Sequence, residues 1–96
     1  MDKEEAQSIL NEIVNDYRAM NRASLMEFLR SPLVFQKVGP SGVEYQIEVQ
    51  AFWDDPRKTD DNLRVMVSID DGRFPHAFLP MTTDFIIKPD GSLLDE

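Results

Sequence analysis

The chain contains no cysteine and only one histidine, His76. The absence of cysteine excludes disulfide bonds, a thiolate nucleophile and cysteine-bound zinc. One histidine cannot build a histidine-rich metal centre, so we expect neither a bound metal nor a cofactor. A protein that needs no such cross-links is typical of the cytoplasm.

Long apolar runs are also missing. No uninterrupted apolar segment approaches the ~20 residues that span a bilayer. The first ten residues, MDKEEAQSIL, are acidic where a signal peptide has its apolar run. No G-x-S-x-G, P-loop or dinucleotide fingerprint occurs in the chain. These absences favour a cytoplasmic protein and leave an enzyme as the least favoured class of function.

Basic residues are few relative to acidic ones. The chain has 18 acidic and 10 basic residues, which gives a formal net charge of −8. Nucleic acid and anionic membranes both require local positive charge, so neither is an expected partner. The net negative charge favours solubility. A more specific interpretation is that the protein binds a basic protein partner or mimics an acidic surface.

The N-terminal third of the chain predicts helices. Apolar residues recur at three- and four-residue spacing over about residues 3–20, which places them on one stripe of a helix. The phase slips at residues 21–24, and Ser24 with Glu27 has the spacing of a capping box, so a second short helix is expected there. One long kinked helix is the alternative. Pro32 ends the helical region, because the residue before proline avoids the α conformation.

The remainder of the chain predicts an antiparallel sheet. Alternation of apolar and polar side chains is typical of strands that are covered on one face. Asp71-Gly72 is a strong signal of a two-residue hairpin turn. Pro89-Asp90-Gly91 predicts a small terminal hairpin with a left-handed glycine. We expect four or five strands, beginning with Leu33–Val38, Val43–Trp53, Leu63–Ile69 and Phe74–Leu79. Val43–Trp53 is the clearest, and Phe74–Leu79 is expected to be short, bulged or at an edge because of its prolines.

Length and pattern together predict a single α+β domain over residues 1–96. The helices occupy about residues 3–31 and pack on the sheet of about residues 33–94, around one core. The residues expected to meet in that core lie on the apolar face of each element: Ile13, Tyr17, Ile47, Val49 and Val67.

The turns also predict which side chains lie on the outer face of the sheet, away from the helices. A two-residue turn at Asp71-Gly72 makes Ile69 oppose Phe74, and the loop after Trp53 pairs that residue with Leu63. A G-P-S-G turn that pairs Val38 with Val43 would turn Leu33 outward as well. Because part of this face is then apolar, the second helix, the C-terminal hairpin or another subunit is expected to cover part of it. The interaction face so predicted comprises Phe35, Phe52, Met66 and Leu79.

The stretch FWDDPRKTDDN, residues 52–62, is the most site-like in the chain, because it contains four aspartates. A calcium EF-hand needs D-x-[DN]-x-[DN]-G followed by glutamate at position twelve. The stretch does not fit this pattern, whether the count begins at Asp54 or at Asp60. Arg57 and Lys58 also offset part of the negative charge of the loop. Aspartate, proline and asparagine are ordinary turn formers, so we interpret the stretch as a hairpin tip rather than a weak cation site.

His76 is the one candidate for acid–base chemistry. A catalytic role would require a carboxylate beside it, and the expected register holds Asp70 and Asp71 several residues away. A packed or rim position is therefore the favoured interpretation. A pocket between helix and sheet would be lined by Trp53, His76 and Phe78.

The C-terminal half carries the stretches YQIEVQAFWDD, VSIDDG and TDFIIKPDGS. Over residues 43–92 it resembles a family of small uncharacterised bacterial proteins. The resemblance implies a bacterial, cytosolic origin and carries no named activity.

Two classes of function follow from these observations. The first is a non-enzymatic protein-interaction module that binds through the outer sheet face, a sheet edge or the second helix. The alternative is a small-molecule-binding protein with a pocket between helix and sheet. A deep apolar pocket with convergent polar groups would favour the second class, whereas a filled core with an exposed apolar patch would favour the first.

Overall fold

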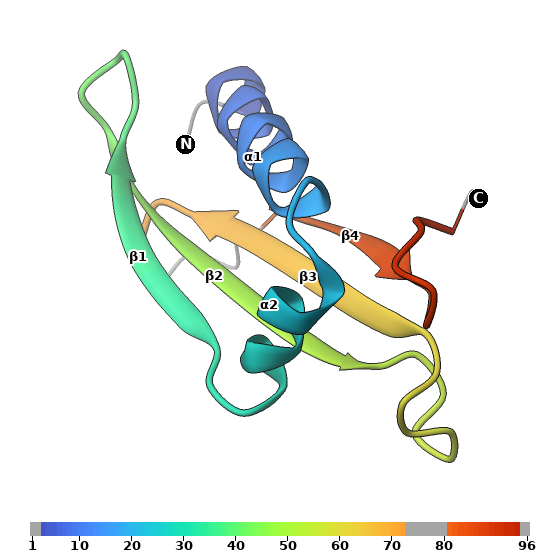
Figure 1. Ribbon diagram of the computed structural model, residues 1–96. Helices are drawn as coiled ribbons and strands as arrows, with labels where there is room; N and C mark the ends of the chain where they lie inside the picture. The colour runs from blue at the N-terminus through green and yellow to red at the C-terminus, as the bar shows by residue number, and fades with distance from the viewer. Residues whose placement is uncertain (1–2, 73–80, 95–96) are drawn as a thin grey trace.

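The computed structural model describes residues 3–72 and 81–94. Within these residues, helices come first along the chain and are followed by one antiparallel sheet in the order β1-β2-β3-β4. Both α-helices lie on the same face of this sheet (Figure 1), which confirms the predicted α+β architecture. The elements are α1 Lys3–Arg18, α2 Arg22–Met26, the 3-10 helix η1 Glu27–Leu29, β1 Leu33–Val38, β2 Glu44–Trp53, β3 Leu63–Asp70 and β4 Met81–Ile87.

The helical region is broken into two α-helices rather than kinked. In α1, the glutamates of the first turn and Arg18 of the last turn both complement the helix dipole. The new helix begins at Asn21, whose side chain accepts a hydrogen bond from the Ser24 N–H at 2.8 Å. The predicted cap at Ser24 is therefore wrong by three positions. Asparagine is as good an N-cap as serine, and here it lies where the chain leaves the helical conformation.

The core lies between the helices and the odd-numbered residues of the central strands. Ile47, Val49 and Val67 are fully buried and Ile13 nearly so, as predicted. Tyr17 is only half-buried and stacks edge-on against Phe28, with ring centroids 5.7 Å apart. The other members of the same cluster are Ala6, Ile9, Leu10, Val14, Leu25, Tyr45, Ala51, Leu63, Val65, Ile69, Phe85 and Ile87.

The turn between β1 and β2 is one residue longer than the sequence suggested. The Gly39 N–H donates to the Val43 carbonyl at 2.8 Å, so Val38 faces Glu44 instead of Val43. Gly42 closes the three-residue loop with a φ of 87°, a left-handed conformation that glycine adopts without strain.

This extra residue reverses the faces of β1. Phe35 faces Ile47 and packs against the core, so its predicted place on the outer face is wrong. A one-residue slip exchanges every side chain of a strand between faces, which is why the error affects the whole of β1. Val34, Gln36 and Val38 are the residues of β1 that point away from the helices.

The partner of β3 also differs from the prediction. β4 pairs with it so that Ile69 faces Met81 and Val65 faces Phe85. The segment Phe74–Leu79, which was expected in this place, lies outside the described residues. Proline cannot donate to a strand ladder, and β4 contains none, so it can pair along its whole length.

The other two turns agree with the sequence. Trp53 faces Leu63 as predicted, and Asp54 to Asn62 form the tip of the hairpin between them. After β4, the Gly91 N–H donates to the Lys88 carbonyl at 2.9 Å, and Gly91 has a φ of 89°. This turn carries the chain back to form a bridge between Ile87 and Leu93.

Candidate interaction surface

The outer edge of β1 is open. Figure 1 shows β1 at the margin of the sheet, and no described residue pairs with its far side. Because the Gly39 N–H points to β2, the alternation of an antiparallel ladder turns the N–H and C=O groups of Val34, Gln36 and Val38 outward. The edge therefore presents a row of backbone donors and acceptors.

The opposite edge of the sheet is partly closed. The C-terminal turn brings Leu94 against β4, where its N–H donates to the Ile86 carbonyl at 2.9 Å. Leu93 adds the bridge to Ile87. The two edges thus differ: among the described residues, β1 has no strand partner along its outer side, whereas β4 is covered at its C-terminal end.

Exposed apolar side chains gather on the same strand. Among the described residues, Leu33, Val34 and Val38 are 39%, 49% and 63% exposed. The fourth exposed large apolar side chain among the described residues is Phe52 on β2, which is 39% exposed. An edge strand normally carries charges that discourage pairing with another chain. β1 has a single charged residue, the half-buried Lys37.

Two prolines limit the open edge. Pro32 and Pro40 flank β1 and, like Val34 and Val38, are even-numbered. Each therefore lies at a position where another residue would turn its backbone N–H outward. Proline has no N–H to donate. The usable part of the edge is therefore confined to three residues, centred on Gln36.

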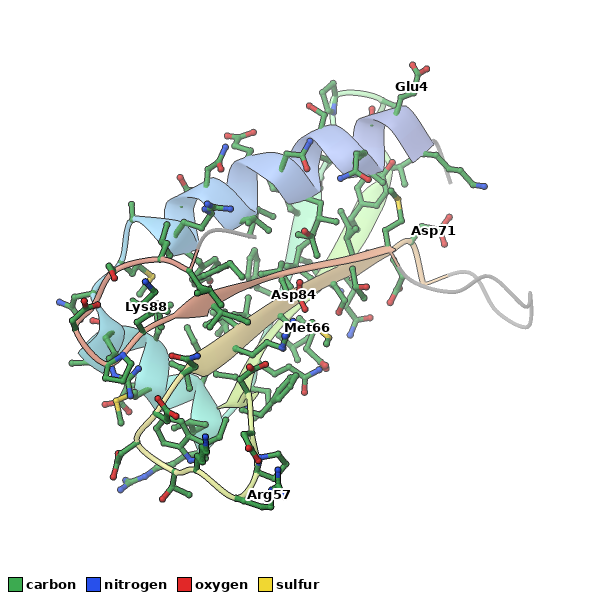
Figure 2. All side chains as sticks on the ribbon, turned by 90° about the vertical axis from the view of Figure 1, so that its right-hand side faces the viewer. Glu4, Arg57, Met66, Asp71, Asp84 and Lys88 are labelled. Atoms are coloured by element: carbon green, nitrogen blue, oxygen red, sulfur yellow. The ribbon has the colours of Figure 1, made fainter. Side chains whose placement is uncertain are left out.

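The outer face of the sheet is mixed in character. Phe52 and Met66 share it, as predicted, while Leu79 lies outside the described residues. Between them Arg64 reaches Asp54 through Nε and Nη2, at 2.9 and 2.7 Å, and Asp84 through Nη1. The bonds to Asp54, and then those to Asp84, raise the pKa of Arg64. Figure 2 shows Met66 and Asp84 next to each other on the sheet, away from α1.

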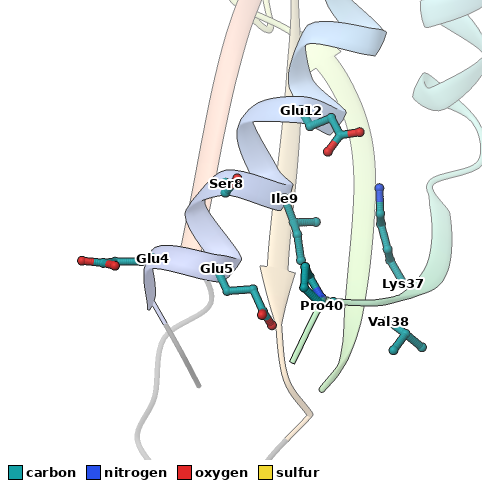
Figure 3. Close-up of a pocket in the computed structure, with 9 residues that line it drawn as sticks. Glu4, Glu5, Ser8, Ile9, Glu12, Lys37, Val38 and Pro40 are labelled. Carbon is teal, nitrogen blue, oxygen red and sulfur yellow. The ribbon is translucent and has the colours of Figure 1, made fainter. Parts of the chain in front are cut away.

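A groove of about 700 Å³ separates α1 from β1 and the turn that follows it. Figure 3 shows Glu12 and Lys37 pointing toward one another across it, while Glu4 points away. Ser8, Ile9 and Pro40 also line the groove, whose walls are polar and apolar in about equal measure. It is not the apolar pocket that a buried small molecule requires.

Glu5 fastens the start of α1 to the turn after β1. Its Oε1 accepts hydrogen bonds from the Tyr45 hydroxyl at 2.8 Å and the Ser41 hydroxyl at 2.7 Å. Its Oε2 accepts from the Ser41 N–H at 3.0 Å. This carboxylate holds the β1–β2 hairpin, and with it the open edge, against the helix.

The aspartate-rich loop uses its side chains to shape itself. Asp55 accepts from the Arg57 N–H at 3.0 Å and pairs with the Arg57 guanidinium at 3.2 Å. These bonds lower the pKa of Asp55. Asp54 is bound by Arg64. Nowhere in residues 3–72 and 81–94 do three potential metal ligands gather. Figure 2 shows Arg57 on this loop, at the end of the molecule far from Glu4.

Trp53 lies in a structural contact rather than in a cavity wall. The Arg22 guanidinium stands 5.7 Å from the centre of its ring and donates to the carbonyls of Asp61 and Ile87, at 2.8 and 3.3 Å. Arg22 thereby ties α2 to the ends of three strands. The other residues of the predicted pocket, His76 and Phe78, lie outside the described residues.

Val34, Gln36 and Val38 were not among the residues predicted to form a site. The signal for them was present as a short apolar strand bounded by Pro32 and Pro40. It was missed because the register of β1 depends on the loop length after Val38, which G-P-S-G alone does not determine.

Comparison with protein-family models, with curated proteins and with solved structures finds no significant match. The resemblance over residues 43–92 therefore stays a prediction. None of the helices in the described parts of the chain combines the length and apolarity needed to cross a membrane.

Proposed function

We propose that this protein is a non-enzymatic interaction module that receives an extended segment of another polypeptide along the outer edge of β1. Strand addition of this kind uses main-chain hydrogen bonds for affinity and alternate side chains for specificity. One observation carries the proposal: the outward backbone groups of Val34, Gln36 and Val38 lie on the strand that holds three of the four exposed large apolar side chains found among the described residues.

The filled core supports this choice over a small-molecule site. The residues between α1 and the sheet are closely packed, and Tyr45, Ile47 and Val49 have no exposed surface. The groove beside α1 is lined about equally by polar and apolar groups, so it is not a deep apolar pocket. A filled core with apolar residues at an edge is the arrangement that favours a protein partner.

A cytoplasmic location and a bacterial origin belong to the same proposal. They rest on the lack of cysteine and on the resemblance over residues 43–92. The module would act by binding alone, since its charged groups form ion pairs and turns, as Arg64 and Asp55 do.

Selection of displayed peptides tests the proposal without a known partner. Random nine-residue peptides on phage are selected on the immobilised wild-type protein. Bound peptides are then tested against Val34→Lys/Val38→Lys, since lysine on an edge strand opposes pairing. They are also tested against Gln36→Pro, which removes the central outward N–H. The matched control is Gln46→Lys/Gln50→Lys, which adds the same charge to the same face of β2.

We expect peptides that bind wild type and the control but neither edge variant. In their presence, the amides of Val34, Gln36 and Val38 should exchange with solvent more slowly. Thermal melts establish that each variant is folded. Failure to select any peptide, or selection of peptides that bind the edge variants equally well, would show that β1 is not the docking strand.

A further inference from the structure

The residues of β1 and its flanks whose backbone groups face outward form a palindrome, with the same order of residue types in both chain directions. From Pro32 to Pro40, every second residue gives proline, valine, glutamine, valine and proline. A two-fold interface brings the same patch of two copies together, so it requires a surface of this self-complementary kind. Building on the proposed function, we infer that the strand received by β1 is β1 of a second copy, antiparallel about a two-fold axis at Gln36.

The backbone groups of such a pair match. Gln36 faces Gln36 of the second copy, and Val34 faces Val38 of the second copy on either side of the axis. These are hydrogen-bonded positions of an antiparallel ladder, because their N–H and C=O groups point outward. The pair forms about six backbone hydrogen bonds and joins two sheets into one continuous sheet.

The side chains match as well. On the outer face, the exposed Val34 and Val38 cover one another in cross-strand pairs of branched residues. On the helix side, Phe35 faces Lys37 of the second copy, where an aliphatic stem can lie on an aromatic ring. Leu33 faces Gly39 of the second copy, where the Glu5 carboxylate and the Tyr45 ring occupy the space beside the glycine.

Side-chain pairing favours this register over its neighbours. Moving the axis by one residue in either direction sets Val38 against Pro32, or Val34 against Pro40. Each such pair forms one backbone bond instead of two, so the total stays at about six, but the exposed valines then face proline and glutamine instead of each other. With the axis at Gln36, the two prolines face each other beyond the ends of the ladder, where neither interrupts a bond.

Charge also permits contact at this strand. Residues 28–43 form the longest stretch of the chain without an acidic residue, although the whole chain carries a net charge of −8. Two copies that meet edge to edge along β1 therefore bring no carboxylate of the strand itself into opposition. Contact through an acid-rich surface would meet stronger repulsion.

The contact is short, so the dimer is expected to be weak. A single strand pair buries less surface than the roughly 1,200–2,000 Å² of stable interfaces. We expect a dissociation constant between about 10 µM and 1 mM, with rapid exchange between monomer and dimer.

A charge exchange across the axis tests both the contact and its register. In Val34→Lys/Val38→Lys, the introduced lysines face each other, and like charges directly opposite weaken strand pairing. In Val34→Glu/Val38→Lys, each introduced acid faces an introduced base across the axis at Gln36. In any shifted register these residues face other partners and gain nothing. Both positions are exposed, and thermal melts confirm that each variant is folded.

Sedimentation equilibrium of the full chain from about 5 µM to 1 mM provides the measurement. We expect a wild-type dimer, a dissociation constant at least about tenfold higher for the lysine pair, and recovery to near wild type for the glutamate–lysine pair. A dimer that neither variant weakens places the interface elsewhere and overturns the inference. So does loss of dimer in both variants, which contradicts the register.

A monomeric wild type at about 1 mM also overturns self-pairing. The peptide selection then separates the two proposals. Peptides that still protect the β1 amides leave the proposed function standing with a different partner. If no peptide binds either, both proposals are wrong.

Discussion

At the scale of single residues, a small set of polar contacts determines where β1 lies. Glu5 can reach Tyr45 and Ser41 only because Gly39 has no side chain. A Cβ at that position would stand 2.4 Å from Glu5 Oε1 and 3.0 Å from Tyr45 Cε2. Gly39 is thus required for close approach rather than for an unusual backbone conformation.

Gly39→Ala is therefore expected to destabilise the fold by about 1–3 kcal/mol, because it displaces the Glu5 carboxylate from its donors. In a Glu5→Ala background the same substitution should cost about 1 kcal/mol less, since the colliding oxygen is gone. Urea unfolding of the four proteins in this cycle measures the coupling. Equal costs in the two backgrounds would show that the carboxylate does not depend on Gly39.

At the scale of elements, sequence periodicity predicts most of the sheet. The alternation from Glu44 to Ala51 determines both the strand and its buried face, because only one phase buries Tyr45, Ile47, Val49 and Ala51. α1 is equally determined by its apolar stripe. β1 is not, since both of its faces carry apolar residues and its register depends on the loop.

The same limit explains what could be predicted of the candidate surface. Phe52 and Met66 were placed correctly because the register of β2 with β3 follows from two well-patterned strands. Phe35 was assigned to the wrong face because the loop that follows Val38 is one residue longer than the predicted G-P-S-G turn. Pairing partners far apart in sequence, such as β3 and β4, were not available from local patterns.

The faces of β2 provide a direct stability test. Ile47→Ala should lower the free energy of unfolding by about 2–5 kcal/mol, because Ile47 is fully buried in the core. Gln46→Ala, one residue away on the exposed face, should change it by less than about 0.5 kcal/mol. Chemical denaturation of both variants makes the comparison, and similar losses would mean that the two faces are assigned wrongly.

The Phe52→Glu variant tests whether the chain associates through the outer face of the sheet or through the edge of β1. Phe52 is exposed, and it does not lie on β1. We expect the variant to keep both its thermal midpoint and its dimerisation. Sedimentation beside the β1 variants gives the answer. A folded but monomeric Phe52→Glu would move the contact to the outer face around Met66.

At the scale of the whole molecule, net charge opposes the association that the edge favours. Each copy carries −8, so a dimer brings together two strongly acidic bodies. Salt screens such repulsion over roughly 10 Å at 0.1 M. The backbone bonds and valine contacts of β1 respond little to salt by comparison.

Raising sodium chloride from about 20 mM to about 500 mM should therefore tighten the dimer by about two- to tenfold. The dissociation constant from sedimentation at several salt concentrations measures this effect. Weakening by salt would indicate an interface held by ion pairs, which the contact between two β1 strands does not contain.

Residue-resolved amide exchange of β1 tests the central claim most directly, because strand addition leaves an alternating pattern. The amides of Leu33, Phe35 and Lys37 point to β2 and should be protected at about 50 µM and at about 1 mM. Because only the monomer exposes them, those of Val34, Gln36 and Val38 should exchange about two- to fourfold more slowly in the concentrated sample than in the dilute one. Equal exchange rates of these three amides at both concentrations, or protection without alternation, would contradict the pairing of β1 with a second copy.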